Sequence, residues 1–129
     1  MTSSAASTTD GPDPTVVAAQ NDAFRKLACL GETPSQPFQG RMHLTSTLAM
    51  AEDGLALDAV QAVGAFDIFE PENDPSGWHD FGAVDIRGEK IFWKTDLYEA
   101  NSDFRYGAEA PDNPATTMRV LTIMMASDW

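Results

Sequence analysis

The segment FGAVDIRGEKIFWKTD, residues 81–96, carries the clearest fold signal in this 129-residue chain. Two runs that mix apolar and polar residues, 81–87 and 90–96, flank the dipeptide Gly88-Glu89. Glycine at the first central position suits a type II′ turn, which joins strands whose side chains alternate between two faces. The sequence therefore predicts a β-hairpin at this place.

The register of this hairpin follows from burial. A Gly88-Glu89 turn gives one apolar face, built from the pairs Ile86–Ile91 and Val84–Trp93. A turn at Arg87-Gly88 would oppose Asp85 to Lys90 but would leave Ile86 against Glu89. A one-residue slip moves side chains between the buried and solvent faces, so we favour the first register.

Elements before the hairpin are read from periodicity. Asp13 followed by Pro14 predicts a helix start, apolar residues recur at helical spacing, and Gly31 predicts its end. Alternation over 42–48 predicts a half-buried strand. The pattern also predicts a short helix over 50–62 and a strand over 63–69, the latter because Gly64 disfavours a helix.

Elements after the hairpin complete the fold prediction. Residues 97–115 contain acidic residues, Asn, Gly and two prolines, which predicts a long surface excursion. The nearly continuous apolar run at 118–126 predicts a central strand covered on both faces. Together the elements predict a single α+β domain over 13–129, a mostly antiparallel sheet with a central hairpin and one or two helices packed on it. Residues 1–12 have the composition of a disordered tail.

The charge of the chain is strongly negative, with 20 Asp and Glu against 8 Lys and Arg. Phosphate-backbone binding depends on Lys and Arg that displace counterions, so direct nucleic-acid binding is disfavoured. A negative surface instead steers association toward a protein partner with a basic surface. Plain solubility is the alternative explanation of the same charge.

Other classes of protein are disfavoured by composition. Cys29 is the only cysteine, which excludes an internal disulfide, and its helical position predicts a buried, unreactive thiol. We expect a cytoplasmic protein without a membrane partner, because there is neither a signal-peptide pattern nor a long apolar run. No motif calls for a cofactor.

The loop before the hairpin holds the candidate catalytic residues Asp74, His79 and Asp80, with Asp96 across the hairpin base. A histidine between carboxylates can act as a general acid or base near neutral pH. Asn-Asp-Pro is also ordinary turn chemistry, and a His-Asp pair before a strand is often structural.

A metal site and an interaction surface are the other readings of this region. Carboxylates at 74, 80, 85 and 96 could join His79 in an oxygen-rich site, but their spacing matches no calcium loop and we assign no metal. Aromatic and charged residues also suit a binding surface. The candidate binding residues are Asn73, Asp74, Trp78, His79, Asp80, Lys94, Asp96, Tyr98 and Tyr106.

Three separated motifs occur in order: N-D-P-x-G-x-H-D-F-G at 73–82, F-W-K-x-D at 92–96 and T-x-R-V-L-T-I-M at 117–124, preceded by N-D-A-F-R at 21–25. In these the chain resembles a family of small proteins of unknown function, common in alphaproteobacteria and often found on plasmids and other mobile elements. The resemblance covers residues 20–129 and implies no established activity.

The chain departs from the family pattern at a few positions. The first is Trp78, where the family commonly has Glu; the others are Thr95, Leu97 and Glu99. If the missing carboxylate were a catalytic acid or a metal ligand, this chain would lack it, which counts against an enzyme.

Two hypotheses follow. In the first, the chain is a non-enzymatic acidic interaction protein of mobile-element type that modulates a basic nucleic-acid-binding or host-defence protein. In the second, it is a small hydrolase-like enzyme that uses Asp74, His79 and Asp80. Residues 52–112 hold 15 of the acidic residues and 4 of the basic ones. This uneven charge and the residue at position 78 favour the first hypothesis.

Overall fold

Helix α2 (Pro14–Leu30) begins and ends where the sequence predicts. The computed structural model describes residues 12–129. In it the Asp13 side chain accepts a hydrogen bond from the Thr15 amide, and proline occupies the first helical position. Gly31 ends the helix in the left-handed region, at φ 74°, which glycine adopts without strain. The predicted tail falls outside the described residues, apart from Pro12.

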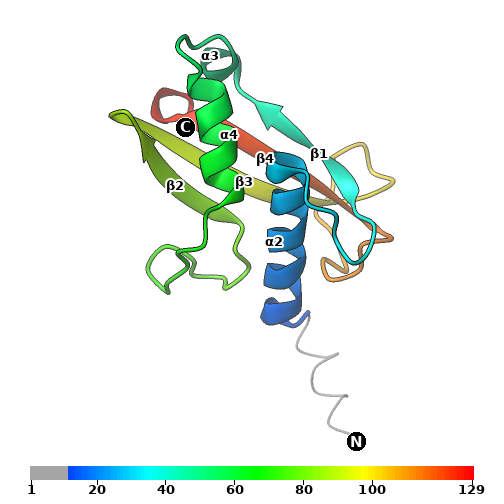
Figure 1. Ribbon diagram of the computed structural model, residues 1–129. Coiled ribbons are helices and arrows are strands. Elements are labelled where there is room, and N and C mark those ends of the chain that lie inside the picture. The colour runs from blue at the N-terminus through cyan, green and yellow to red at the C-terminus, as the bar shows by residue number, and fades with distance from the viewer. Residues whose placement is uncertain (1–11) are drawn as a thin grey trace, which may run out of the picture.

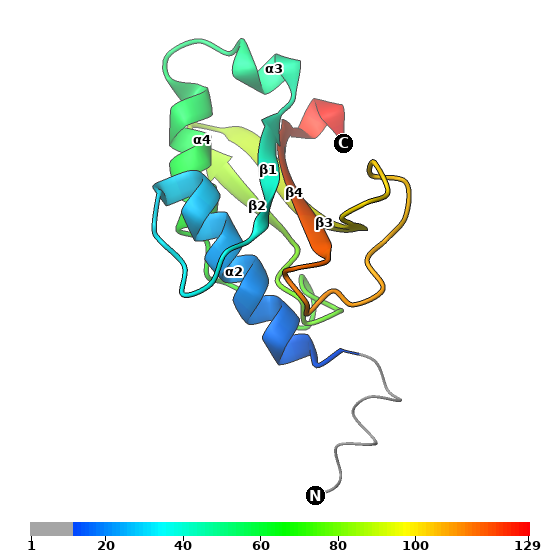
Figure 2. The same ribbon diagram turned by 90° about the vertical axis from the view of Figure 1, so that its right-hand side faces the viewer.

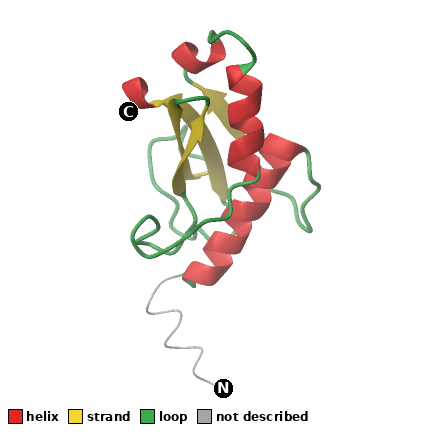
Figure 3. Ribbon diagram, turned by 60° about the vertical axis from the view of Figure 1, so that its left-hand side comes forward, coloured by secondary structure: helices red, strands yellow, loops and turns green. Residues whose placement is uncertain are grey.

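The fold has two layers: a mixed four-stranded sheet and a helical layer on one of its faces (Figures 1 and 3). In spatial order the strands are β1 (Gln39–Leu44), β4 (Thr117–Met125), β3 (Glu89–Glu99) and β2 (Phe81–Ile86). Strand β1 runs parallel to β4, whereas the other two pairings are antiparallel. The predicted α+β class is confirmed, with one parallel pairing in an otherwise antiparallel sheet.

The hairpin of β2 and β3 forms, but the predicted register is wrong. Asp85 pairs with Lys90 and Ile86 pairs with Glu89, so the turn is the Arg87-Gly88 alternative that we disfavoured. Both turn residues have positive φ, 51° and 86°, as a type I′ turn requires.

Packing at the base of the hairpin explains the observed register. It places Gly82 opposite Trp93, and a Cβ at Gly82 would lie 2.5 Å from the Trp93 indole nitrogen. Only glycine leaves room for this buried indole. The prediction of the register counted apolar pairs across the hairpin and did not consider this steric constraint. At the other end, the Arg87 guanidinium binds the Asp58 carboxylate of the helical layer, which stabilises arginine at a left-handed turn position.

The predicted strand over 42–48 is too long. Strand β1 ends at Leu44, and residues Ser46–Ala49 form the short helix α3. The hydroxyl groups of Thr45 and Thr47 both donate to the carboxylate of Asp128, at 2.7 and 3.1 Å. This contact turns the chain away from the sheet, and Leu48 is then fully buried in the core.

The predicted helix over 50–62 exists but is shifted, and the predicted strand over 63–69 is wrong. Helix α4 spans Leu55–Gly64, after Gly54 in the left-handed region. Gly64 was expected to disfavour a helix, yet it is the point of closest approach to α2. A Cβ there would lie 2.6 Å from the Leu30 side chain. Glycine is retained in this helix because the two helices touch at this residue.

Predictions for the second half of the chain are closer to the structure. Strand β3 continues to Glu99, so the surface excursion begins at residue 100 and not at 97. The predicted central strand over 118–126 is confirmed as β4, between β1 and β3. The expectation that it is covered on both faces is wrong, because the helices pack on one face of the sheet and alternate residues of β4 are partly exposed on the other. Trp93 is fully buried, as predicted, and its ring meets those of Phe66 and Phe69 edge-on.

Cys29 lies in α2 with intermediate exposure, and its sulfur is 3.9 Å from that of Met42. Burial raises the pKa of the Cys29 thiol to about 11. The thiol is therefore protonated at neutral pH, which disfavours reaction as a nucleophile, whereas the expected full burial is not found.

A fully buried arginine joins α2 to the sheet. Arg119, on β4, donates to Asn21 Oδ1 at 2.8 Å, to Gln20 Oε1 at 3.0 Å and to the Pro111 carbonyl at 3.2 Å. Burial lowers the pKa of Arg119 to about 10, so it remains charged at neutral pH. Its guanidinium also lies 5.1 Å from the centre of the Phe38 ring. Neutral acceptors and an aromatic face stabilise the charge here.

A second buried arginine connects the two helices. Arg25 donates to the carbonyls of Val63 and Phe66, at 3.1 and 3.0 Å, and so caps the C-terminal end of α4. It also pairs with Asp22 at 3.1 Å and lies 4.8 Å from the Trp93 ring. These contacts turn the chain out of α4 into an irregular loop, where the sequence pattern predicted a strand.

The sheet face opposite the helices carries no helical layer (Figure 2). We call it the open face. The excursion over 100–116 lies at one end of it, where Phe104 meets Tyr98 edge-on at 5.5 Å. The C-terminal turn η1 (Ala126–Asp128) lies at the other end, where the Trp129 ring contacts Phe81 and Phe92. None of the helices in residues 12–129 is long and apolar enough to cross a lipid bilayer.

The observed register makes a direct prediction. Gly82→Ala inserts a methyl group against the Trp93 indole, so we expect the free energy of unfolding to fall by about 1–3 kcal/mol. Gly107→Ala is the matched control, because the nearest atom to its added Cβ is 3.9 Å away. Urea unfolding followed by tryptophan fluorescence measures both variants. Equal stability of Gly82→Ala and the parent protein would contradict this packing.

Candidate functional site

His79 contacts carboxylates through both ring nitrogens. Its Nδ1 lies 2.9 and 3.0 Å from the two oxygens of Asp22, and its Nε2 lies 3.7 Å from Asp74 Oδ2. One face of the imidazole stacks on Phe69, with ring centres 3.8 Å apart and an interplanar angle of 4°. We call these four residues the His79 cluster.

The structure brings two of the predicted residues together and adds one member. Asp74 and His79 are neighbours, as the sequence suggests, but the closer carboxylate comes from Asp22 on α2. The N-D-A-F-R motif contains this residue, although its role could not be read from the motif alone. Through the hydrogen bond between Nδ1 and the Asp22 carboxylate, His79 attaches the loop to α2.

Asp80 lies near Asp74 of the His79 cluster but bonds to a different side chain. Its side chain reaches Ser76 at 3.5 Å, and its backbone carbonyl accepts a hydrogen bond from the Thr95 amide. Burial raises the pKa of the Asp80 carboxyl, and the nearby charges of Asp74 and Asp96 add to the shift. Asp80 is thus the acidic group of this loop whose environment disfavours ionisation.

The other loop residues have structural contacts. The Asn73 amide donates to the Ile68 carbonyl at 3.0 Å and its oxygen accepts from the Glu70 amide at 2.7 Å, which is turn chemistry. The Trp78 carbonyl accepts from the Asn21 side chain at 2.9 Å, and Trp78 itself is half-buried. Asn73 and Trp78 therefore shape the loop.

The remaining candidate residues lie on another surface. Lys94, Asp96 and Tyr98 alternate with buried residues along β3 and project from the open face. Lys94 and Asp96 form an ion pair at 3.1 Å. Tyr98 was expected in a loop, yet it belongs to the strand, whereas Tyr106 lies in the excursion and is 65% exposed. The predicted site is thus divided between two surfaces.

Two acidic segments flank one turn of α2. The Asn21 side chain donates to the Trp78 carbonyl of the loop over 67–80, and the neighbouring Gln20 donates to the Asp112 carbonyl of the excursion at 2.9 Å. Both segments lie at the end of the sheet nearest the N-terminal half of α2 (Figures 1 and 2). Residues 67–80 contain five Asp and Glu and no Lys or Arg, and residues 99–112 contain four with one Arg.

The open face holds a depression that the sequence did not reveal. A concave region of about 480 Å³ is lined by His43, Thr45, Lys94, Thr122, Met124, Asp128 and Trp129. A second one of about 490 Å³ adjoins it at His43 and includes Arg41. Of these residues only Lys94 was proposed for the site. The alternation of 42–48 did place His43 on one face of a strand, but the order of strands was needed to bring it near Lys94.

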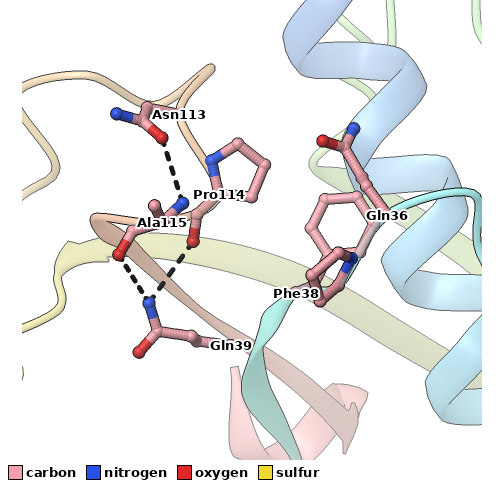
Figure 4. A pocket seen from close by; sticks show the side chains of 7 residues that line it. Gln36, Phe38, Gln39, Asn113, Pro114 and Ala115 are labelled. Carbon is pink, nitrogen blue, oxygen red and sulfur yellow. Dashed lines mark hydrogen bonds between the residues drawn. The ribbon is translucent and has the colours of Figure 1, made fainter.

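A third depression lies beside the start of β1 and has no charged lining residue (Figure 4). It measures about 410 Å³, with Gln36 and Phe38 on one side and Pro114 on the other. The Gln39 amide donates to the carbonyls of Pro114 and Ala115, at 3.3 and 2.8 Å. These contacts anchor the end of the excursion to β1, which is a structural task.

Metal-binding residues do not gather in the described part of the chain. Within residues 12–129, no group of three or more His, Cys, Asp or Glu is arranged to hold a metal ion. Asp85 pairs with Lys90 at the hairpin and Asp96 pairs with Lys94 on the open face, so two of the carboxylates considered for a metal point to lysines.

A family model described as a protein of unknown function, DUF3768, matches residues 44–128. No match was found among curated proteins or among solved structures. The matched region contains the loop over 67–80, the hairpin, the excursion and β4, whereas α2 and its N-D-A-F-R motif precede it. Since the match covers well over half of the chain, the protein belongs to the DUF3768 family.

Proposed function

We propose that this protein is a non-enzymatic interaction protein that binds a partner with a basic surface through its two acidic segments. The observation that carries the proposal is their attachment to adjacent residues of α2, Gln20 and Asn21. Two acidic segments that are far apart in the sequence are thereby attached to neighbouring positions of α2. Fixed negative charge attracts a positive partner and accelerates its association.

The exposed carboxylates of these segments are free to meet a partner. Within residues 12–129, none of them forms an ion pair with Lys or Arg; they are Asp67, Glu70, Glu72, Asp103 and Glu109. Carboxylates near the hairpin behave differently, because Asp58 and Asp85 pair with Arg87 and Lys90. The described part of the acidic segments thus presents exposed carboxylates without an ion pair, whereas near the hairpin part of the negative charge is offset by Arg87 and Lys90.

Burial of arginine increases this imbalance. Arg25 and Arg119 are both fully buried, so two of the eight Lys and Arg side chains do not contribute to the surface that a partner meets. Tyr106, exposed within the acidic excursion, supplies an aromatic group of the kind that anchors interfaces.

The partner class follows from charge. An array of carboxylates can occupy a groove that evolved for phosphates, since both present negative charge to Lys and Arg. A basic nucleic-acid-binding protein or a host-defence protein is the partner that we infer, with the chain acting as an inhibitor or modulator of mobile-element type. The motif resemblance stated above supports the mobile-element part of this proposal.

Neutralising charges in one acidic segment tests the proposed binding surface. We expect the triple variant Asp67→Asn, Glu70→Gln, Glu72→Gln to lose at least about tenfold in affinity for a basic partner retained from a host extract. These side chains are exposed, so the fold should persist. Affinity is measured by calorimetry at two salt concentrations, and binding of the parent protein should weaken steeply with salt.

The matched control removes the same charge elsewhere. Glu52→Gln, Asp53→Asn, Glu89→Gln also neutralises three exposed carboxylates, but near the hairpin turn. We expect this variant to bind within about twofold of the parent protein. Equal losses in both triple variants, or a partner whose binding is insensitive to salt, would refute the proposed surface.

The alternative function, a small hydrolase-like enzyme, draws support from one observation. Asp80 is a half-buried carboxyl with a raised pKa, which is a property of general acids. Asp74 and His79 would be its neighbours in such a site. The hydrogen bond of His79 Nδ1 with Asp22 and the stacking of its ring on Phe69 hold the imidazole in place, which weighs against this function, since a general base must reach its substrate.

A separate prediction concerns the effect of Asp80 on the stability of the folded protein. Its raised pKa means that the folded state binds the proton more tightly than the unfolded chain, so ionisation disfavours folding. This cost is absent at low pH, where both states are protonated, and it appears as the pH rises through the unfolded pKa. We therefore expect Asp80→Asn to raise the melting temperature at pH 7 and to have a smaller effect near pH 3. A lower melting temperature at pH 7 would show that ionised Asp80 stabilises the loop.

A further inference from the structure

We propose that the open face binds a mononucleotide, in the trough formed by the two adjoining depressions that share His43. The ligand class is a phosphate monoester joined to a planar aromatic base. This inference goes beyond the proposed interaction function and uses a different surface. The residues that carry it are His43, Thr45, Lys94, Thr122, Asp128 and Trp129.

The strand register aligns polar groups across the floor of the trough. His43 on β1 pairs with Thr122 on β4, and Thr122 pairs with Lys94 on β3. The three side chains therefore form one row on the open face. With strands about 4.8 Å apart, the backbones of His43 and Lys94 are separated by roughly 10 Å, with the Thr122 hydroxyl between them. A phosphate group above Thr122 can be reached from both sides by charged or hydrogen-bonding groups.

The trough carries two cationic side chains, Arg41 and Lys94, together with two carboxylates, Asp128 in its wall and Asp96 paired with Lys94, so a phosphate must displace Asp96 from the lysine. Arg41 and His43 project from the same face of β1, and Lys94 projects beside them, in a chain whose net charge is −12. The Arg41 guanidinium is held 4.3 Å from the centre of the Phe104 ring, which leaves its hydrogen-bond donors available. Basic groups on a concave surface favour a small anion.

The wall of the trough supplies groups that can contact the base and the sugar of a nucleotide. Trp129 is 68% exposed and its ring contacts Phe81 and Phe92 at tilted angles, with ring centres 5.2 and 5.3 Å apart, so much of the ring surface is accessible for stacking. Asp128 is fixed by hydrogen bonds from Thr45, Thr47 and the Met125 amide. A fixed carboxylate beside an aromatic face can accept hydrogen bonds from sugar hydroxyls.

The ends of the trough limit the length of the ligand. Phe104 covers one end together with the acidic residues of the excursion, and Trp129 with η1 covers the other. A polynucleotide that continued past Phe104 would meet Glu99 and Asp103, which repel phosphates. The volume of about 480 Å³ lies within the range of small-ligand sites.

Titration with adenosine 5′-monophosphate tests the site. We expect saturable shifts of the amide signals of His43, Lys94 and Thr122 and of the Trp129 indole in proton–nitrogen correlation spectra. Lys94→Gln should weaken binding about tenfold, the cost of one charge-assisted hydrogen bond. Asp96→Asn should tighten it severalfold, because Asp96 pairs with the Lys94 ammonium and competes with the phosphate.

The matched control is Lys90→Gln, on the same strand but outside the trough, which should bind within about twofold of the parent protein. Four results would overturn the proposal. They are no saturable shifts up to about 10 mM ligand, equal binding of inorganic phosphate alone, equal weakening by Lys90→Gln and by Lys94→Gln, and tighter binding of a single-stranded oligonucleotide than of the mononucleotide.

Discussion

The buried guanidinium group of Arg119 is the constraint on which the rest of the structure depends. A charged group without water must find hydrogen-bond acceptors, and those available are the side chains of Gln20 and Asn21 and the Pro111 carbonyl. These acceptors come from α2 and from the excursion. Because Arg119 on β4 needs these acceptors, it holds α2 against the sheet and holds the excursion beside α2.

The same two α2 residues then determine the surface. Each uses its oxygen for Arg119 and its amide group for a carbonyl of an acidic segment, Gln20 for Asp112 and Asn21 for Trp78. The next residue, Asp22, holds His79, and about one turn further along Arg25 holds the end of α4. Residues that look catalytic or ligand-binding in the sequence thus largely attach loops to the core. The functional consequence is the arrangement of charge on the outside.

Local rules of sequence predicted much of the fold and little of the site. The caps of α2, the existence of the hairpin and the central position of β4 follow from proline, glycine and apolar periodicity, which act over a few residues. The register of the hairpin does not, because it depends on the indole of Trp93 fitting over Gly82. The strand expected after Gly64 fails for a similar reason, since the capping of α4 by Arg25 is a contact across 38 positions of sequence.

The candidate site shows the same limit. His79 and Asp74 were recognisable because they are close in sequence, whereas Asp22 was hidden 57 positions away. Arginine is usually exposed, so no sequence pattern assigned Arg25 and Arg119 to the core. His43 and Lys94 lie on strands separated by β4, and only the strand order aligns them. Sites built from several strands cannot be read from spacing alone.

Amide hydrogen exchange of the Asn21→Ala variant, compared with the parent protein, tests the central claim most directly. This substitution removes one acceptor of Arg119 and the donor to the Trp78 carbonyl. The account predicts that the amides of Gly77 and His79 and those of the excursion, such as Ala108, lose protection together, while the hairpin amides of Val84 and Ile91 keep theirs. Unchanged protection in both acidic segments, or a uniform loss across the whole domain, would contradict a network that holds them jointly.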